Sequence, residues 1–383
     1  MLKFSLIDTK IRHLLGTIGV LSLALIIVFT LSAFPHIIEH YYAEGFFIYV
    51  SRTLHFIFNL IPFSFGDVLY IVTIGYLIYA FIMAVRMAFK RLFKLLGLFI
   101  LRFLIGMQAA ILIFYLFWGL NYYRPSAAQL LDLRDTTYTL QDLQSVTQLL
   151  IDSANKTRAA LNLSDLSQSN RMIFHNGVNA IKNLSTSYAV LRSYSPKVKS
   201  SLISPLLNYM GTSGYYNPFT SEAQLNYEMP VFDRPFTACH EMSHQMGFGR
   251  EDEANFIGFI AGIHSNERLL KYSAYYAAME EFLQHLHRRD SLSYKSLKLQ
   301  ISPAVKTDLK ADMTYWMKYA GSIGMYTSTF YDQFLKANNQ PAGLKTYNRM
   351  IILTMAYYHK QKVYRTGSTD STVNHPSHLP LTN

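Results

Sequence analysis

Three long stretches without a charged residue lie in the first third of this 383-residue chain, and they constrain its fold more than any other feature. They cover residues 14–34, 68–85 and 103–123. A helix rises about 1.5 Å per residue, so each stretch is long enough to cross a hydrocarbon layer of about 30 Å. Core helices of a soluble protein would not keep every charge at their flanks. We therefore expect three transmembrane helices, with the lipid bilayer as a partner.

The composition indicates that the rest of the chain meets water. The chain is 50% hydrophobic and only 15% charged, yet its mean hydropathy is +0.12, too low for a chain that is membrane-embedded throughout. We expect a membrane domain over residues 1–124, a helical domain over 125–365 and a disordered, Ser/Thr/Pro-rich tail over 366–383. The first span exceeds the roughly 7–15 apolar residues of a signal peptide, so we expect it to remain uncleaved.

The charges around the spans predict an orientation. Basic residues precede the first span and fill the loop between the second and third, whereas the loop between the first and second has only Arg52 beside three carboxylates. Basic loops stay cytoplasmic. This places the N-terminus in the cytoplasm and the domain after the third span on the outer, periplasmic or extracellular side. We interpret residues 46–65 as an interfacial or re-entrant helix; a fourth span there would invert the topology.

The same partition accounts for the net charge of +11. Up to Arg124 the chain has 10 Lys and Arg against 4 Asp and Glu, and the other 259 residues have 25 against 20. The basic excess therefore reflects topology and contact with anionic lipid. No basic patch interleaved with aromatic residues indicates nucleic acid as a partner. The single cysteine, Cys239, excludes an intramolecular disulfide and a cysteine-based zinc cluster. The oligomeric state is left open.

From Thr139 onward the apolar residues recur at helical spacing. Thr139 and Asp142 resemble a capping box, and residues 214–227 predict a hairpin with Pro218 and Ser221 near its turn. Other helices are expected over 170–186, 234–246, 252–265, 267–288, 306–319, 327–337 and 344–364. The predicted fold class is mainly α, with three transmembrane helices, a helix-rich domain and a small β-hairpin or sheet.

The segment His240-Glu241-Met242-Ser243-His244 is an HExxH motif. On a helix, His240 and His244 share one face, where two imidazoles can bind one Zn²⁺ and Glu241 can act as the general base. Local signals predict that helix, because Asp233 can act as its N-cap, Pro235 lies in its first turn and Gly247 ends it. A third ligand can come from the following Glu-Asp-Glu-Ala-Asn, through either Glu251 or Glu253.

This block resembles the gluzincin branch of the zincin metallopeptidases, in which HExxH is followed by ExxA(D/N) on a second helix. The resemblance implies that Glu251 is the third zinc ligand and that Asn255 orients a ligand histidine. The seven-residue step from His244 to Glu251 is shorter than in most gluzincins, so Glu253 stays open as an alternative ligand. The metzincin pattern fails, because Arg250 stands where its third histidine would be.

The three spans, the GYYNPFT segment and HQMGFGREDEANF together resemble an uncharacterised bacterial family of membrane-anchored, zincin-like proteins. In zincins a strand edge beside the metal aligns the substrate, and residues 214–227 are the candidate here. Tyr215 and Tyr216 are candidate oxyanion donors, as are Tyr326 and Tyr331. His264 is a weaker candidate for supplementing the site.

We therefore expect a membrane-anchored, zinc-dependent hydrolase on the outer face of the bacterial cytoplasmic membrane, with endopeptidase as its leading activity and a peptide or protein as its substrate. Glu241 would be its general base. The alternative is a membrane sensor or assembly factor with a structural or vestigial zinc site. A structural site has no need of a base, so the intact Glu241 favours the hydrolase.

Overall fold

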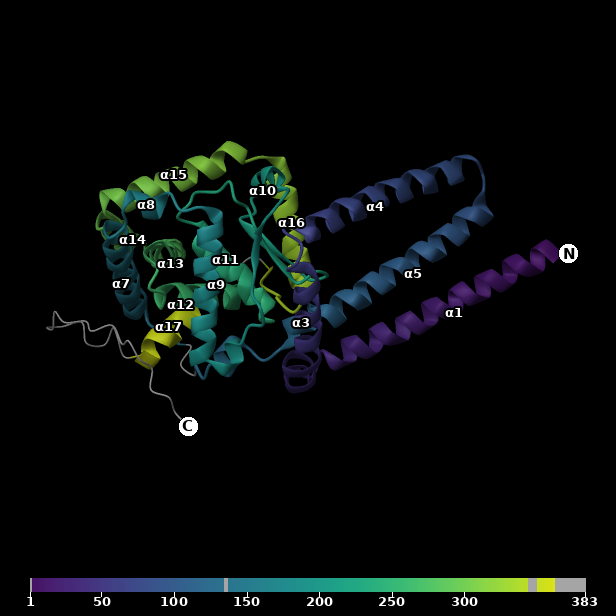
Figure 1. Cartoon of the computed structure of the whole chain (residues 1–383), viewed down its shortest axis with the longest axis horizontal. Coiled ribbons are helices and arrows are strands. Elements are labelled where there is room, and N and C mark those ends of the chain that lie inside the picture. The colour runs from purple at the N-terminus through teal and green to yellow at the C-terminus, as the bar shows by residue number, and fades with distance from the viewer. Residues whose placement is uncertain (1, 134–136, 344–349, 362–383) are drawn as a thin grey trace. The chain divides into compact units, whose positions relative to one another are not determined.

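The computed structural model describes residues 2–133, 137–343 and 350–361, and its chain divides into two compact units (Figure 1). The first unit holds the chain up to Arg124 together with Pro218–Ser221, and the second holds Pro125–Asn217 and the residues from Glu222 onward. The mainly α fold with a small sheet is confirmed. The predicted tail over 366–383 lies outside the described residues, as do 344–349 and 362–364 of the last predicted helix.

Three helices of the first unit are long and apolar enough to cross a membrane. They are α1 (Leu2–Leu31, apolar over Thr9–Leu31), α4 (Phe65–Phe89) and α5 (Phe93–Phe117). Both α1 and α4 pack along α5, and the Gln108 amide donates to the Ser22 hydroxyl at 2.8 Å. Many of their large apolar side chains are exposed, up to 85% at Phe89. Lipid would cover these side chains in a bilayer, which fits a membrane protein.

The third span differs from its predicted bounds of 103–123. Helix α5 begins ten residues earlier, at Phe93, and ends at Phe117. It includes Lys94 and Arg102. A membrane helix tolerates such residues near its end, since long basic side chains can extend to the interface. At Trp118 the backbone leaves the helical region with φ of −157°, and Gly119–Tyr123 continues as a 3₁₀ helix, η2.

The segment between α1 and α4 folds as short helices. It consists of α2 (Pro35–Ile37), the π-helix η1 (Ile38–Phe46) and α3 (Phe47–Phe58). At 12 residues, α3 is roughly 18 Å long and too short to span the bilayer. Within this unit Arg124 forms a two-point ion pair with Glu39 at 2.6 and 2.7 Å. The imidazole of His55 lies 3.1 Å from the carbonyl oxygen of Ser221.

The second unit is a helical domain around a continuous apolar core. Its helices before the last strand of the sheet are α6 (Ala127–Leu130), α7 (Leu140–Ala159), α8 (Leu163–Leu166), α9 (Asn170–Ser187), η3 (Ala189–Leu191) and α10 (Ser204–Met210). Those after it are α11 (Arg234–Gln245), α12 (Glu251–Ile263), α13 (Arg268–Arg289), α14 (Ser291–Leu299), α15 (Pro303–Tyr319), α16 (Ser322–Ala337) and α17 (Met350–Gln361). The capping box of Thr139 and Asp142 is confirmed at the start of α7.

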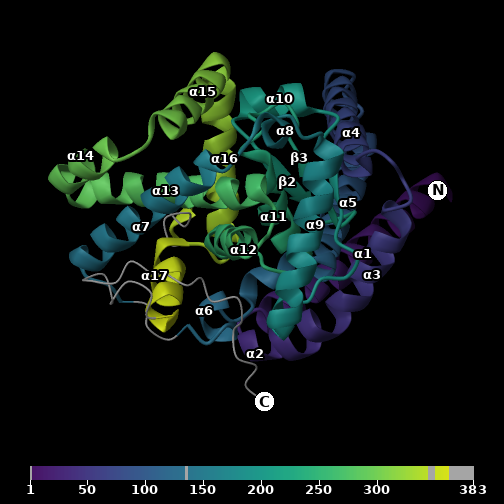
Figure 2. The ribbon, with the colours of Figure 1, turned by 60° about the vertical axis from the view of Figure 1, so that its left-hand side comes forward.

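Helix α11 lies inside this domain, packed by α9, α12, α13 and the sheet (Figure 2). Every residue of α11 from Thr237 to Gln245 is buried. A helix that is covered on all sides presents polar side chains only to other protein groups or to a buried site. The HExxH motif therefore lies in the interior of the domain.

The sheet has three strands in the order β1 (Val198–Ser200), β3 (Glu222–Leu225) and β2 (Gly214–Asn217). The hairpin prediction is confirmed, because β2 and β3 pair antiparallel and Pro218–Ser221 connects them. Strand β1, which was not predicted, pairs parallel to β3, and its Lys199 forms a buried ion pair with Glu222. Strand β2 is at one edge of the sheet and contacts α11.

Candidate metal centre

The turn after α11 positions the second histidine of the motif. Gly247 has φ of +83°, a conformation that glycine adopts without strain. Its N–H donates to the carbonyl of His244 at 3.0 Å, and the N–H of Phe248 donates to that of Ser243 at 3.3 Å, which is a Schellman motif. This turn brings the carbonyl oxygen of Phe248 back to His244, so the glycine that ends the helix also helps to build the site.

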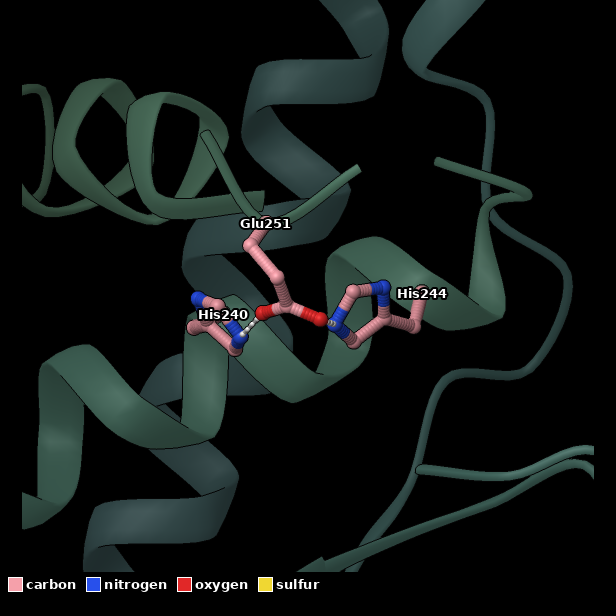
Figure 3. Close-up of side chains that lie close together, drawn as sticks. All are labelled: His240, His244 and Glu251. Atoms are coloured by element: carbon pink, nitrogen blue, oxygen red, sulfur yellow. Dashed lines mark ion pairs between the residues drawn. The ribbon is translucent and has the colours of Figure 1, made fainter. Parts of the chain in front are cut away.

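Three ligand atoms converge at the junction of α11 and α12 (Figure 3). His240 and His244 lie one turn apart on α11, and Glu251 is the first residue of α12. The Nε2 atom of His240 is 3.2 Å from Oε2 of Glu251, and that of His244 is 3.8 Å from Oε1. Among the described residues, this is the one group of three such side chains whose ligand atoms lie within 4.8 Å of one another.

The other nitrogen of each imidazole donates to a protein oxygen. Nδ1–H of His240 donates to the side-chain oxygen of Asn255 at 2.7 Å, and that of His244 donates to the carbonyl of Phe248 at 2.6 Å. Both hydrogen bonds leave Nε2 of the imidazole turned towards Glu251. Such outer hydrogen bonds fix the tautomer and orientation of metal-binding histidines.

The residues present fit a zinc ion. Zinc–nitrogen and zinc–oxygen bonds of about 2.0–2.2 Å in a tetrahedron place neighbouring ligand atoms roughly 3.3 Å apart, close to the separations from Glu251 to the two imidazoles. Two imidazoles and one carboxylate form a ligand set that borderline metals such as zinc favour. The hydroxyl of Tyr331, on α16, donates to Oε1 of Glu251 at 2.6 Å. Each of the three ligands is therefore held by a further contact.

Glu241 lies beside the first ligand and under strand β2. A Cβ atom at Gly214 would come within 2.8 Å of Oε1 of Glu241 and within 2.8 Å of the carbonyl oxygen of Gln224. Only glycine allows the strand to approach this closely. The sequence predicts Gly214 in the hairpin but not in the site, because a glycine in a strand can mark a bulge, a bend or a close approach of another group.

Burial dominates the electrostatics of the site. It raises the pKa of Glu241 to about 8 and lowers that of His244 to about 4. Burial also acts against the charged form of Glu251, but the charge of His244 and contacts from His240 and Tyr331 outweigh it and lower the pKa to about 2. For His240, the opposing effect of burial is outweighed by Glu251 and Glu241, and its pKa is raised. His240, Glu241 and His244 lie within about one helical turn of one another, and their pKa values are nevertheless shifted in different directions.

The alternative ligand Glu253 lies elsewhere. Its Oε1 atom accepts the backbone N–H of Ala127 at 2.9 Å and is 3.7 Å from a guanidinium nitrogen of Arg250. The structure therefore brings Glu251, and not Glu253, to the histidines. His264 is also directed away, since its Nε2 atom is 2.7 Å from the hydroxyl oxygen of Tyr357 on α17.

The tyrosine candidates separate in the structure. Tyr215 and Tyr216 lie on β2, and the ring of Tyr216 is centred 6.2 Å from that of His244. Tyr331 contacts a ligand, whereas Tyr326 is 71% exposed. Cys239 is a buried free cysteine within the apolar core.

The predicted N-cap of α11 is wrong in its side chain. Asp233 precedes the helix, but its carboxylate makes no capping hydrogen bond. The hydroxyl of Ser273, on α13, accepts the N–H of Phe236 at 3.0 Å instead. A neighbouring helix thus satisfies a first-turn donor that local sequence assigned to Asp233.

Residues 42–355 match the model of the family described as "Protein of unknown function (DUF3810)". The chain belongs to this family. The match covers α4, α5 and the whole of the candidate metal centre, so these are features of a DUF3810 protein, whereas α1 precedes the matched residues. No match was found among the curated proteins or among the solved structures.

Proposed function

We propose that this DUF3810 protein is a membrane-anchored zinc hydrolase that cleaves peptides. The observation that carries the proposal is the convergence of His240, His244 and Glu251 next to the carboxylate of Glu241. A catalytic zinc site keeps three protein ligands and one open position, and no fourth His, Cys, Asp or Glu joins this group in the described part of the chain. A carboxylate with no ligand role beside such a group is suited to proton transfer.

The protein residues would divide the work as follows. Zinc in a site with an open position polarises a carbonyl group and makes water more acidic. The Glu241 carboxylate would accept the proton of the attacking water and deliver it to the nitrogen of the leaving amine. Asn255 and the Phe248 carbonyl hold the imidazoles in the tautomer that binds metal, and Tyr331 holds Glu251.

We also propose the orientation of the chain. Basic residues lie in the N-terminal part of α1 and fill the segment between α4 and α5, which favours a cytoplasmic location for both. With three spanning helices, the hydrolase domain would then lie on the outer face of a bacterial cytoplasmic membrane. Its substrates would be peptides or protein segments on that face.

The test uses the full-length protein purified in detergent, with its zinc content measured by mass spectrometry and its cleavage of a fluorogenic peptide mixture measured in parallel. We expect one zinc per chain in the wild type and in Glu241→Gln, whereas hydrolysis falls by roughly 10²–10⁴-fold in the variant because the general base is lost. Glu253→Gln is the matched control, because the side-chain carbonyl oxygen of the new glutamine can still accept the N–H of Ala127. Zinc binding and activity should persist in this variant.

Full activity of Glu241→Gln would refute the mechanism. A wild-type chain that binds one zinc but cleaves no peptide would instead favour a sensor or assembly factor with a structural zinc site.

A further inference from the structure

A second polar site lies beside the metal centre, in a cavity of about 400 Å³. Its walls come from the start of α11, from α13 and α15, and from the segment before β2. Three carboxylates line it, those of Asp233, Glu280 and Asp312, while no lysine, arginine or histidine does. This imbalance of charge is unusual for the interior of a domain, where acids are paired.

Several polar atoms in this cavity make no well-formed hydrogen bond to any described residue. Tyr276 is 1% exposed, and its hydroxyl oxygen lacks such a bond, although it interacts with Glu280. Oδ2 of Asp233 and Oδ1 of Asp312, both inaccessible to water, also lack one, and these two carboxyl groups interact with each other. Leaving buried polar groups unpaired destabilises a fold, so a set of them around one cavity points to a missing polar guest.

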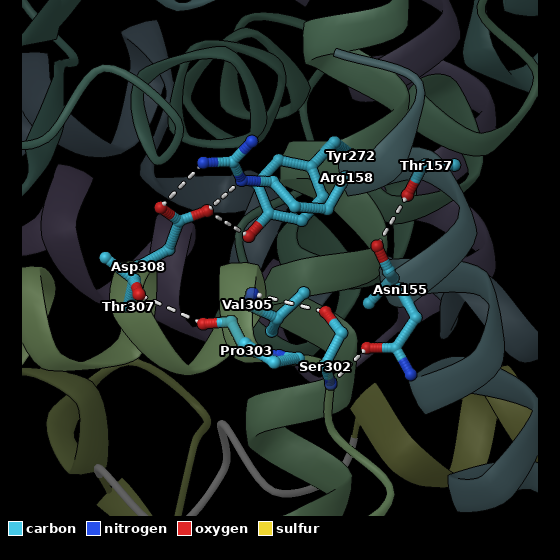
Figure 4. A network of polar contacts seen from close by, with 10 residues as sticks. Asn155, Thr157, Arg158, Tyr272, Ser302, Pro303, Val305, Thr307 and Asp308 are labelled. Carbon is cyan, nitrogen blue, oxygen red and sulfur yellow. Dashed lines mark hydrogen bonds and ion pairs between the residues drawn. The ribbon is translucent and has the colours of Figure 1, made fainter.

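A neighbouring acid shows the paired alternative. Asp308 lies one turn before Asp312 on α15, and it binds the guanidinium of Arg158 at 2.5 and 3.3 Å and the hydroxyl of Tyr272 at 2.6 Å (Figure 4). Arg158 thus pairs with Asp308, whereas no described lysine, arginine or histidine lines the cavity that Asp312 lines.

The lack of a cation is also visible in the acidities. Burial, with the charge of Asp312, raises the pKa of Glu280 to about 7. Burial, with the charges of Asp312 and Glu280, raises the pKa of Asp233 well above its ordinary value. An external cation would favour the ionised forms of these groups.

The cavity and the candidate metal centre share helix α11. Asp233, Thr237 and Glu241 are spaced four residues apart and so share one face of the helix, with Asp233 about 12 Å along the axis from Glu241. The first two line the cavity. On the opposite wall Ser213 also lines it, and the next residue, Gly214, packs against Glu241.

We propose that this cavity is a subsite for a basic side chain of the substrate, with its ammonium or guanidinium group between Asp233, Glu280 and Asp312. The inference rests on the proposed hydrolase function and names a substrate class for it. Phe236 and Trp316 provide apolar wall for the methylene groups of such a side chain. An organic cation fits better than a metal ion, because these three carboxylates do not form a group with metal-ligand spacing.

Binding is tested first, without zinc. Acetyl-arginine amide is titrated into the EDTA-treated full-length protein at pH 8, with the neutral analogue acetyl-citrulline amide as the comparison probe. We expect the arginine probe to bind at least about tenfold more tightly. The double variant Asp233→Asn/Glu280→Gln should remove this preference. Glu281→Gln should keep it, because Glu281 is the next residue on α13 and its pKa is also raised by burial to about 7, but it does not line the cavity.

Turnover is tested second, on zinc-loaded protein. Peptides with arginine at one position should have kcat/KM at least about tenfold above their citrulline counterparts, and the double variant should lose this ratio while it still cleaves the citrulline peptides. An unchanged zinc content and a melting temperature no lower than that of the wild type exclude misfolding of the variant. Peptide cleavage without preference for charge would overturn the subsite alone, whereas arginine binding without any peptide cleavage would overturn both the subsite and the hydrolase.

Discussion

Two buried polar clusters share helix α11, and they differ in how many of their polar atoms form hydrogen bonds or ion pairs within the protein. In the metal centre each imidazole nitrogen and each oxygen of Glu251 has a protein contact. In the neighbouring cavity the acids and Tyr276 interact mainly with one another, and oxygens of Asp233, Asp312 and Tyr276 make no well-formed hydrogen bond to a described residue. The first cluster is preorganised by its own protein, as metal sites are. The second cluster would gain its missing hydrogen bonds and counter-charge only from a bound ligand, which is typical of a recognition site and not of a structural one.

The largest expected effect breaks the first cluster. His240→Ala removes one of the three candidate ligands and leaves Oε2 of Glu251 without its contact at 3.2 Å. Structural zinc sites gain roughly 10–16 kcal/mol from four ligands, so the loss of one corresponds to at least about a hundredfold weaker zinc binding. Competition with a chelator of known affinity measures it.

His264→Ala is the matched control for that variant. This histidine ends α12 and contacts Tyr357, so its removal should leave zinc affinity unchanged. If His240→Ala bound zinc as tightly as the control, the triad would not be the metal site.

A smaller effect tests the second cluster through its pH dependence. The pKa of Glu280 is about 7 in the folded protein and 4.5 for a glutamate in water, so between these pH values the folded state holds a proton that the unfolded state releases. An acid with a raised folded pKa destabilises the fold increasingly as pH rises through this window. Glu280→Gln should therefore stabilise the protein by roughly 3 kcal/mol at pH 8 and by almost nothing at pH 4.

Thermal unfolding of the full-length protein in detergent at the two pH values measures this difference. Glu281→Gln should give a similar gain at pH 8, because burial raises that pKa to about 7 as well. Stability then groups Glu280 with Glu281, whereas binding of the arginine probe separates them. An equal gain from Glu280→Gln at both pH values would show that its carboxylate is not destabilised in the folded protein.

The two clusters also differ in how much the sequence reveals. His240, His244 and Glu251 lie within 12 residues, and Gly247 marks the turn between their helices. Spacing along a helix and the conformational preference of glycine are local properties, so the two histidines and the turn were predictable, whereas Glu251 was implied by the resemblance and Glu253 stayed open as the alternative. The three apolar helices were predictable for the same reason, although α5 starts ten residues before the predicted span.

The cavity was not predictable from local patterns. Asp233, Glu280 and Asp312 come from three helices and are separated by 47 and 32 residues. Local rules assigned Asp233 to a helix cap, a role that Ser273 fills from another helix. Likewise, the three-residue strand β1 is stabilised by its partner β3, including the buried Lys199–Glu222 pair, and not by its own sequence. The structure at these positions is determined by tertiary packing, which leaves no pattern of fixed spacing in a single sequence.

The smallest expected effect concerns Tyr331, which the sequence suggested as an oxyanion donor and which the structure places on Oε1 of Glu251. A metal ion would neutralise much of the charge on that carboxylate, so the hydrogen bond should contribute about 0.5–1.5 kcal/mol, as between neutral groups. Tyr331→Phe should then weaken zinc binding by a few-fold to about tenfold and leave kcat at saturating zinc nearly unchanged. Tyr326→Phe, which alters an exposed residue five positions earlier, should change neither quantity. A large fall in kcat with unaltered zinc affinity would instead show that Tyr331 contacts the reacting atoms. A residue that only positions a metal ligand should change zinc affinity more than it changes kcat.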